Sequence, residues 1–245
     1  MKYILEICAG SLGSALAAQQ GGADRVELCD NLYEGGTTPS SGMIKTCKSL
    51  LNIPLFPIIR PRGGDFVYTD QEFEVMKQDV LCCLELACEG IVFGILLPDG
   101  SVDIERCSEL VKLSGDMQIT FHRAFDRCND HKQGLEDIIR MGFHRVLTSG
   151  GMENAEDAIP ELSRLIHHAN GRICMMPGSG ITPNNLSKIK ATGALEFHTT
   201  AKTKIDHVSG IHPNNLDTPY LFQTDVLKVR EMRQILNAAT AGVNH

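Results

Sequence analysis

The chain contains no tryptophan, and aromatic residues make up only 5% of its 245 positions. It also lacks an excess of positive charge, because 23 Lys and Arg stand against 30 Asp and Glu, for a net charge of −7. Nucleic-acid-binding domains combine a basic surface with aromatic side chains that stack on bases. The composition therefore argues against a nucleic-acid partner.

Long apolar runs are lacking as well. No run approaches the roughly 18 apolar residues that a membrane-spanning helix needs, and the first residues show no charged-then-apolar leader. The nine cysteines are an odd number with no Cys-x-x-Cys pair, so we expect most of them to be reduced thiols. These features predict a cytoplasmic protein without a membrane partner.

Apolar runs and helical periodicity alternate along the chain. The apolar runs predict strands at residues 3–8, 25–29, 55–60, 90–96, 117–122, 145–148, 172–176 and 194–199. The periodic segments predict helices at residues 11–21, 40–51, 69–88, 103–113, 132–141, 154–169, 182–191 and 223–238. Eight strand–helix units in 245 residues predict a single-domain (β/α)₈ TIM barrel over residues 1–245. An open doubly wound sheet is the alternative, but it gives polar strand ends no reason to share a centre.

Two connections are long for this fold, namely residues 30–39 and 202–222. Loops of this length commonly serve function. Each follows a predicted strand, and barrel active sites lie at the ends where strands finish. We therefore expect both loops to cover the mouth of the barrel.

The pattern Glu-x-Cys closes each of the first two predicted strands, as Glu6 with Cys8 and as Glu27 with Cys29. Side chains alternate between the two faces of a strand, so each glutamate shares a face with its cysteine. A buried carboxylate needs a partner, and a thiol is a soft metal ligand or a nucleophile. The repetition predicts either a functional site or a structural ion-pair layer with two inert cysteines.

Ionisable residues also end the third, fifth and eighth predicted strands. If the flanking apolar residues face the helices, these side chains face the lumen, where crowding forces them to pair and shifts their pKa values. The candidate cleft residues are Glu6, Glu27, Arg60, His122, Glu196 and His198. Alternatively, Glu6, Glu27, Arg60 and Glu196 form a purely structural salt-bridge network.

Glycine-rich turns follow the sixth and seventh predicted strands. They contain Ser149, Gly150 and Gly151, and then Gly178, Ser179 and Gly180. Backbone amides of such turns together with a helix N-terminus can hold an anion, and barrels often bind phosphate nearby. Arg60, Arg62 or Arg123 could add positive charge. The pattern predicts an anion site, although the glycines could simply permit tight turns.

Several short motifs in one order resemble the CutC family of copper homeostasis proteins. They are Glu6-x-Cys8 and residues 22–29, 35–40, 60–66, 120–126, 147–151 and 196–198. The resemblance implies a (β/α)₈ barrel, a cytoplasmic location, self-association and a role in copper tolerance. It also implies Cu(I) binding by Cys8 and Cys29.

Two functions remain open. The first is a copper homeostasis protein that binds Cu(I) through thiolates, which suit this ion. The second is an enzyme acting on a small anionic, possibly phosphorylated, substrate, with a Glu or His as general base. The partner is thus expected to be a copper ion or a small anionic ligand.

Overall fold

A computed structural model describes residues 2–205 and 221–238 of the chain. Eight parallel strands follow one another in chain order: β1 (Ile4–Ala9), β2 (Arg25–Leu28), β3 (Leu55–Pro57), β4 (Gly90–Phe93), β5 (Gln118–Phe121), β6 (Arg145–Thr148), β7 (Cys174–Pro177) and β8 (Glu196–Thr199). Hydrogen bonds join them as β3-β2-β1-β8 and β4-β5-β6-β7. Ile58 and Val92 form a parallel bridge next to β3 and β4, and β7 lies beside β8. The predicted (β/α)₈ barrel is confirmed.

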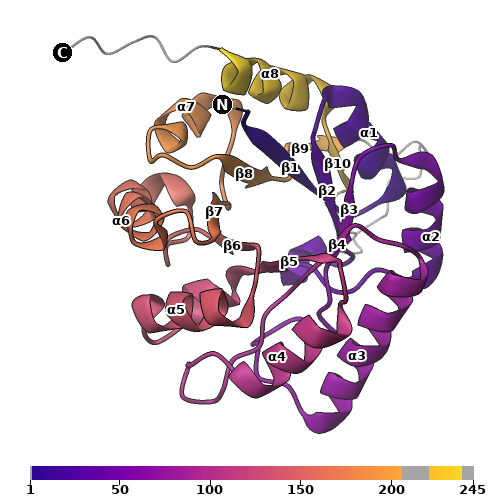
Figure 1. Ribbon diagram of the computed structural model, residues 1–245. Helices are drawn as coiled ribbons and strands as arrows, with labels where there is room; N and C mark the ends of the chain where they lie inside the picture. The colour runs from indigo at the N-terminus through magenta and orange to yellow at the C-terminus, as the bar shows by residue number, and fades with distance from the viewer. Residues whose placement is uncertain (1, 206–220, 239–245) are drawn as a thin grey trace, which may run out of the picture.

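Helices cover the outside of this strand ring (Figure 1). They are α1 (Leu12–Gly21), α2 (Ser41–Leu50), α3 (Asp70–Glu85), α4 (Ile104–Leu113), α5 (His131–Met141), α6 (Ile159–Ala169), α7 (Pro183–Lys190) and α8 (Val226–Asn237). Three short 3₁₀ helices, η1 (Leu32–Glu34), η2 (Arg123–Arg127) and η3 (Ala155–Ala158), lie in loops after β2, β5 and β6. The last helix, α8, packs against α1 and α7 and so joins the two ends of the ring.

The strands separate apolar from ionisable side chains as the alternation predicts. Leu5 and Ile7 of β1 and Val26 and Leu28 of β2 are fully buried in the main hydrophobic core. This core lies between strands and helices, and its burial supplies the main favourable term in folding. The residues between these apolar positions, such as Glu6, therefore face the lumen.

The structure differs from the prediction near the C-terminal end. An antiparallel hairpin of β9 (Lys202–Ile205) and β10 (Leu221–Thr224) was not predicted. Gln223 and Thr224, predicted as helical, belong to β10, because the Asp225 side chain caps α8 by accepting from the Leu227 amide. Residues 206–220, the middle of the long loop predicted at 202–222, lie outside the described residues.

The other long loop lies where it was predicted. Leu32 and Gly35 of residues 30–39 line a cavity at the C-terminal ends of the strands. Within residues 2–205 and 221–238, no helix has both the length and the apolar character to cross a membrane.

Candidate metal centre in the barrel lumen

The thiols of Cys8 and Cys29 are in contact. Cys8 lies near the end of β1, Cys29 directly follows β2, and their Sγ atoms are 3.3 Å apart. Cys29 donates its S–H to the Ala9 carbonyl at 3.6 Å. Gly36 packs over this pair with a φ of 91°, and a Cβ there would lie 3.3 Å from the Cys29 Cβ. The two cysteines therefore converge as their repeated motif suggested.

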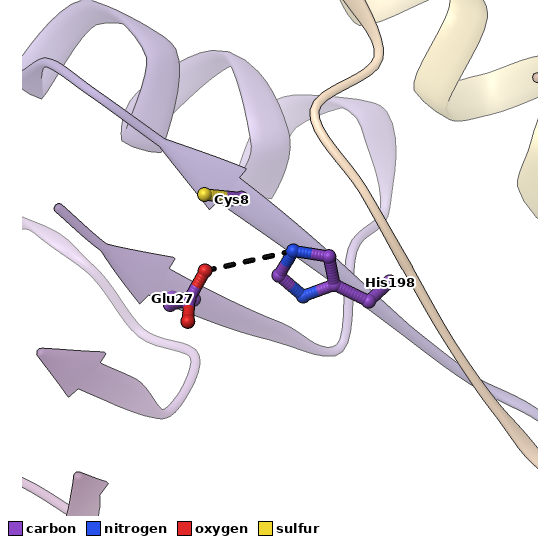
Figure 2. Close-up of side chains that lie close together, drawn as sticks. All are labelled: Cys8, Glu27 and His198. Atoms are coloured by element: carbon purple, nitrogen blue, oxygen red, sulfur yellow. Dashed lines mark ion pairs between the residues drawn. The ribbon is translucent and has the colours of Figure 1, made fainter. Parts of the chain in front are cut away.

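A carboxylate and an imidazole lie beside Cys8. The ligand atoms of Cys8, Glu27 and His198 are all within 4.8 Å of one another, and all three residues are buried. Figure 2 shows the three side chains close together, with a dashed line for the contact between His198 and Glu27. Nε2 of His198 is 3.5 Å from Oε2 of Glu27. Thiolate, carboxylate and imidazole are all metal ligands, so this group could hold a metal ion.

Glu6 fixes the orientation of the imidazole. Its Oε1 is 2.7 Å from Nδ1 of His198, and its side chain is fully buried. Since Nδ1 is engaged by Glu6, the other ring nitrogen faces Glu27 and Cys8. Such carboxylate–histidine pairs commonly orient histidines at metal sites.

Two arginines neutralise the deeper carboxylates. Arg25 pairs through Nε with Glu6 and through Nη2 with Glu196 at 2.6 Å. Arg145 adds a contact from its Nε to the same oxygen of Glu196 at 3.1 Å. Sequence reasoning missed both arginines, although Arg25 is in phase with Glu27 and therefore shares its face. Glu6 and Glu196 thus belong to an ion-pair layer that lies below the thiols.

Arg60 lies elsewhere than expected. It was expected to neutralise the lumen carboxylates, but its Nη1 donates to the carbonyls of Glu34 and Gly36 at 2.6 and 2.7 Å. Its Nη2 donates to the Gly64 carbonyl at 2.9 Å. Because β3 ends at Pro57, Arg60 lies beyond the strand, at the level of the loops. The guanidinium therefore joins two mouth loops instead of compensating Glu6.

Neighbouring groups favour the protonated forms of Cys8 and His198. The neighbouring Cys29 thiol, burial and the Glu27 charge raise the pKa of Cys8 well above its usual value. Burial would lower the pKa of His198, but Glu27, Cys8 and Glu6 outweigh it and raise that pKa well above its usual value. Burial raises the pKa of Glu27, as it does that of Cys8. Without a metal, the site thus holds a Cys8 thiol beside a His198 imidazolium, and a bound metal must displace protons.

The pKa of Glu6 shifts in the opposite direction from that of Glu27. Desolvation alone would raise its pKa, but the Arg25 guanidinium and the His198 hydrogen bond hold that pKa well below its usual value. Glu6 is therefore an anion that lies between the Arg25 guanidinium and the His198 imidazole.

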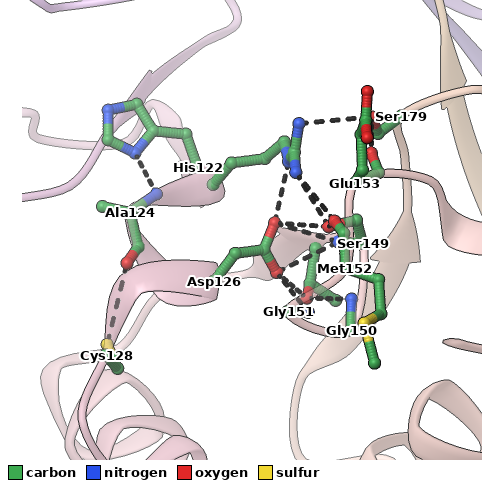
Figure 3. Close-up of polar contacts among 12 residues, drawn as sticks. His122, Ala124, Asp126, Cys128, Ser149, Gly150, Gly151, Met152, Glu153 and Ser179 are labelled. Carbon is green, nitrogen blue, oxygen red and sulfur yellow. Dashed lines mark hydrogen bonds and ion pairs between the residues drawn. The ribbon is translucent and has the colours of Figure 1, made fainter. Parts of the chain in front are cut away.

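His122 reaches the same cavity from β5 but stands apart from the metal-ligand group. Its Nδ1 accepts a hydrogen bond from the Ala124 amide at 3.2 Å (Figure 3). Its ring packs 4.8 Å from that of Phe66, centroid to centroid. Burial, and secondarily the Arg60 charge, lower the pKa of His122 to about 3. The imidazole is therefore neutral at physiological pH.

The first predicted glycine turn is filled by a carboxylate of the protein itself. Asp126 accepts from the Ser149 amide at 3.1 Å and from the Gly151 amide at 3.2 Å (Figure 3). It also pairs with Arg123 at 2.7 Å. Since these amides are engaged, they cannot form the predicted anion cradle, and Gly150 serves the turn with a φ of 69°. The correction follows from a contact across 23 positions, which the local pattern did not reveal.

The second turn remains open to the cavity. The Gly178 amide donates a hydrogen bond to the Thr148 carbonyl at 2.9 Å. Ser179 and Gly180, which precede α7, line the cavity. The cavity has a volume of about 710 Å³. Its lining also includes the predicted site residues Cys8, Glu27, Arg60, His122 and His198. Glu6, Glu196 and Cys29 lie outside its lining as given by the described residues.

Comparisons with known proteins agree on one family. The model of the CutC family matches residues 3–203. A CutC family protein from Chromobacterium violaceum is 45% identical over 98% of this chain and 100% of its own length. The human copper homeostasis protein cutC homolog is 44% identical over 95% of this chain and 89% of its own length.

Solved structures agree with this result. The crystal structure of CutC from Streptococcus agalactiae has 36% identity and a TM-score of 0.78, covering 81% of this chain and 98% of that one. A thiamine phosphate pyrophosphorylase from Pyrococcus furiosus, at 13% identity and a TM-score of 0.61 over 96% of this chain and 95% of that one, shares the fold alone. The motifs, the barrel and these matches all lead to one conclusion: the chain belongs to the CutC family.

Proposed function

We propose that this protein is a cytoplasmic copper homeostasis protein that binds Cu(I) through Cys8 and Cys29. The observation that carries the proposal is the contact between the two sulfurs, 3.3 Å apart and nearly inaccessible to solvent. Two thiolates form a soft ligand set, which favours Cu(I) over hard cations. The human relative bears the name of a copper homeostasis protein, which supports the same function here.

A positive charge lies beside the thiols. Two thiolates with one Cu(I) carry a single net negative charge, which is costly in a buried site unless it is compensated. The His198 imidazolium lies beside Cys8 and supplies one positive charge. His198 therefore acts as the charge partner of a two-thiolate copper site, while Glu6 holds its ring in place.

Competition with a chromogenic Cu(I) chelator tests this function. We expect the wild-type protein to withdraw one equivalent of Cu(I) and the Cys8→Ser/Cys29→Ser double variant to lose tight binding. The matched control is Cys47→Ser/Cys107→Ser, since these two cysteines are buried as well but belong to helices α2 and α4, in the main hydrophobic core. Equal stoichiometry and affinity in the Cys8/Cys29 variant would overturn the proposal.

A second function is favoured by the size of the cavity. A volume of about 710 Å³ is in the range of small-molecule sites, and far exceeds the space that one copper ion needs. Glu27 and His198 line it with shifted pKa values, which is typical of acid–base catalysis. An enzyme acting on a small anionic substrate is therefore the alternative, and electron density of a co-purified organic molecule in this cavity would favour it.

A further inference from the structure

Two buried donors in the wall of the cavity are unused. Nε of Arg60 and Nε2 of His122 have no hydrogen-bond partner in the part of the chain that the structure describes. The two residues are only 3% and 4% exposed, and both line the cavity. Buried polar groups are nearly always hydrogen-bonded, because leaving one unsatisfied is costly. Two such groups on one wall therefore need an explanation.

The proton on His122 is located by its neighbour. The Ala124 amide donates to Nδ1 at 3.2 Å, so Nδ1 must present its lone pair. In a neutral imidazole the proton then resides on Nε2, which becomes a donor. The side chain thus offers an N–H to the cavity and needs an acceptor there.

Arg60 adds an uncompensated positive charge. Its terminal nitrogens donate only to the backbone carbonyls of Glu34, Gly36 and Gly64, and within residues 2–205 and 221–238 no ion pair with a carboxylate involves it. A buried charge is costly unless it is paired. The Phe66 ring contacts both donors, with the Arg60 guanidinium 5.0 Å and the His122 ring 4.8 Å from its centroid. We refer to Arg60, Phe66 and His122 as the donor wall.

The neighbouring tyrosine cannot satisfy both donors. Among the described residues the buried Tyr68 hydroxyl has no well-formed hydrogen bond. Burial raises the pKa of Tyr68 to about 12, and the nearby Arg60 guanidinium opposes this rise by its charge and by hydrogen bonding. A small rotation could let it accept from Arg60, but Tyr68 does not line this cavity. His122 would still lack an acceptor.

We propose that the donor wall is a subsite for the oxyanion of a small molecule, a carboxylate or a phosphate group, which accepts from His122 Nε2 and neutralises Arg60. An oxyanion has several acceptor oxygens and a negative charge, which are the two properties that this wall lacks. The remainder of the molecule would occupy the cavity, whose lining also includes Cys8, Glu27 and His198. The subsite is independent of Cu(I) binding by the two thiols.

NMR of ¹⁵N-histidine-labelled protein tests the subsite, with inorganic phosphate and acetate as separate probes. We expect at least one probe to shift the Nε2 resonance of His122 to saturation. Two variants separate the ring nitrogens: His122→Gln keeps a donor near the Nε2 position, whereas His122→Asn keeps only the acceptor near Nδ1. Calorimetry measures the anion affinity, which should fall roughly tenfold or more in His122→Asn. This is the loss expected for a hydrogen bond to a charged group. The affinity should stay near wild type in His122→Gln.

The matched control is His144→Asn, because Nδ1 of His144 also accepts from a backbone amide, that of Ile119 at 3.0 Å, away from the cavity lining. This variant should bind both probes like wild type. A response to phosphate alone or to acetate alone identifies the group that the wall takes. The proposal is overturned if neither probe binds saturably, or if His122→Asn binds as tightly as wild type. Cu(I) titration of the same variants keeps this result separate from the copper proposal.

Discussion

Arg25 and Glu196 form an ion pair that joins the beginning and the end of the barrel. Nη2 of Arg25 in β2 is 2.6 Å from Oε2 of Glu196 in β8, across 171 positions of sequence. The two strands are both neighbours of β1, and Arg25 also pairs with Glu6 of that strand. One guanidinium therefore compensates two carboxylates at the point where the ring of strands closes.

The first prediction concerns this pair. Arg25→Ala should lower the free energy of unfolding by about 3–5 kcal/mol, because it breaks two buried ion pairs. Glu6 would keep only His198 and Glu196 only Arg145 as charged partners. Arg172→Ala is the control, since it breaks a solvent-screened surface pair with Glu136 and should cost far less than Arg25→Ala. Urea unfolding measures both. A similar loss in the two variants would show that the lumen carboxylates find compensation elsewhere.

The lumen side of β1 and β2 could be anticipated because the other face of each of these strands is apolar. Leu5 and Ile7 must face the helices, which leaves Glu6 and Cys8 for the interior. The same rule includes Arg25, two positions before Glu27. It was overlooked because it begins its strand, where a charged residue also suits the surface.

Positions beyond the strands could not be predicted in this way. Arg60 lies past the end of β3, and its direction is set by carbonyls of Gly36 and Gly64, which belong to two separate loops. Asp126 fills the turn at Ser149 through contacts between different loops. Such arrangements depend on tertiary structure, which local patterns do not record.

A second prediction concerns the protons that copper displaces. If Cys8 and Cys29 bind Cu(I) as thiolates, two thiol protons leave on binding, because the pKa of Cys8 is raised and Cys29 donates its S–H to Ala9. The logarithm of the Cu(I) affinity should then rise by about two per pH unit near neutrality. Chelator competition at several pH values measures the slope. In Cys29→Ser a slope near one is expected, and an unchanged slope would exclude Cys29 as a ligand.

A third prediction concerns the imidazolium. The Glu27 charge helps to raise the pKa of His198, so Glu27→Gln should lower that pKa, which an NMR titration of the ring measures. Glu231→Gln is the control, since Glu231 also lines the cavity but is exposed. An unchanged His198 pKa in Glu27→Gln would mean that Glu6 and Cys8 hold the proton, and would leave Glu27 without an electrostatic role.

The last prediction is a pH dependence of stability that arises at His122. Its pKa is lowered to about 3, whereas an unfolded histidine titrates near 6.5. Between these values the unfolded state binds the extra proton, so this contribution to stability is present above about pH 6.5 and is lost as the pH falls. From about pH 7 to about pH 5.5 the wild-type protein should lose roughly 1 kcal/mol more than His122→Gln in urea unfolding. His167→Gln, at an exposed position, should lose as much as wild type. Equal losses in wild type and His122→Gln would show that His122 is protonated in the folded protein, and would remove the neutral Nε2 donor from the cavity wall.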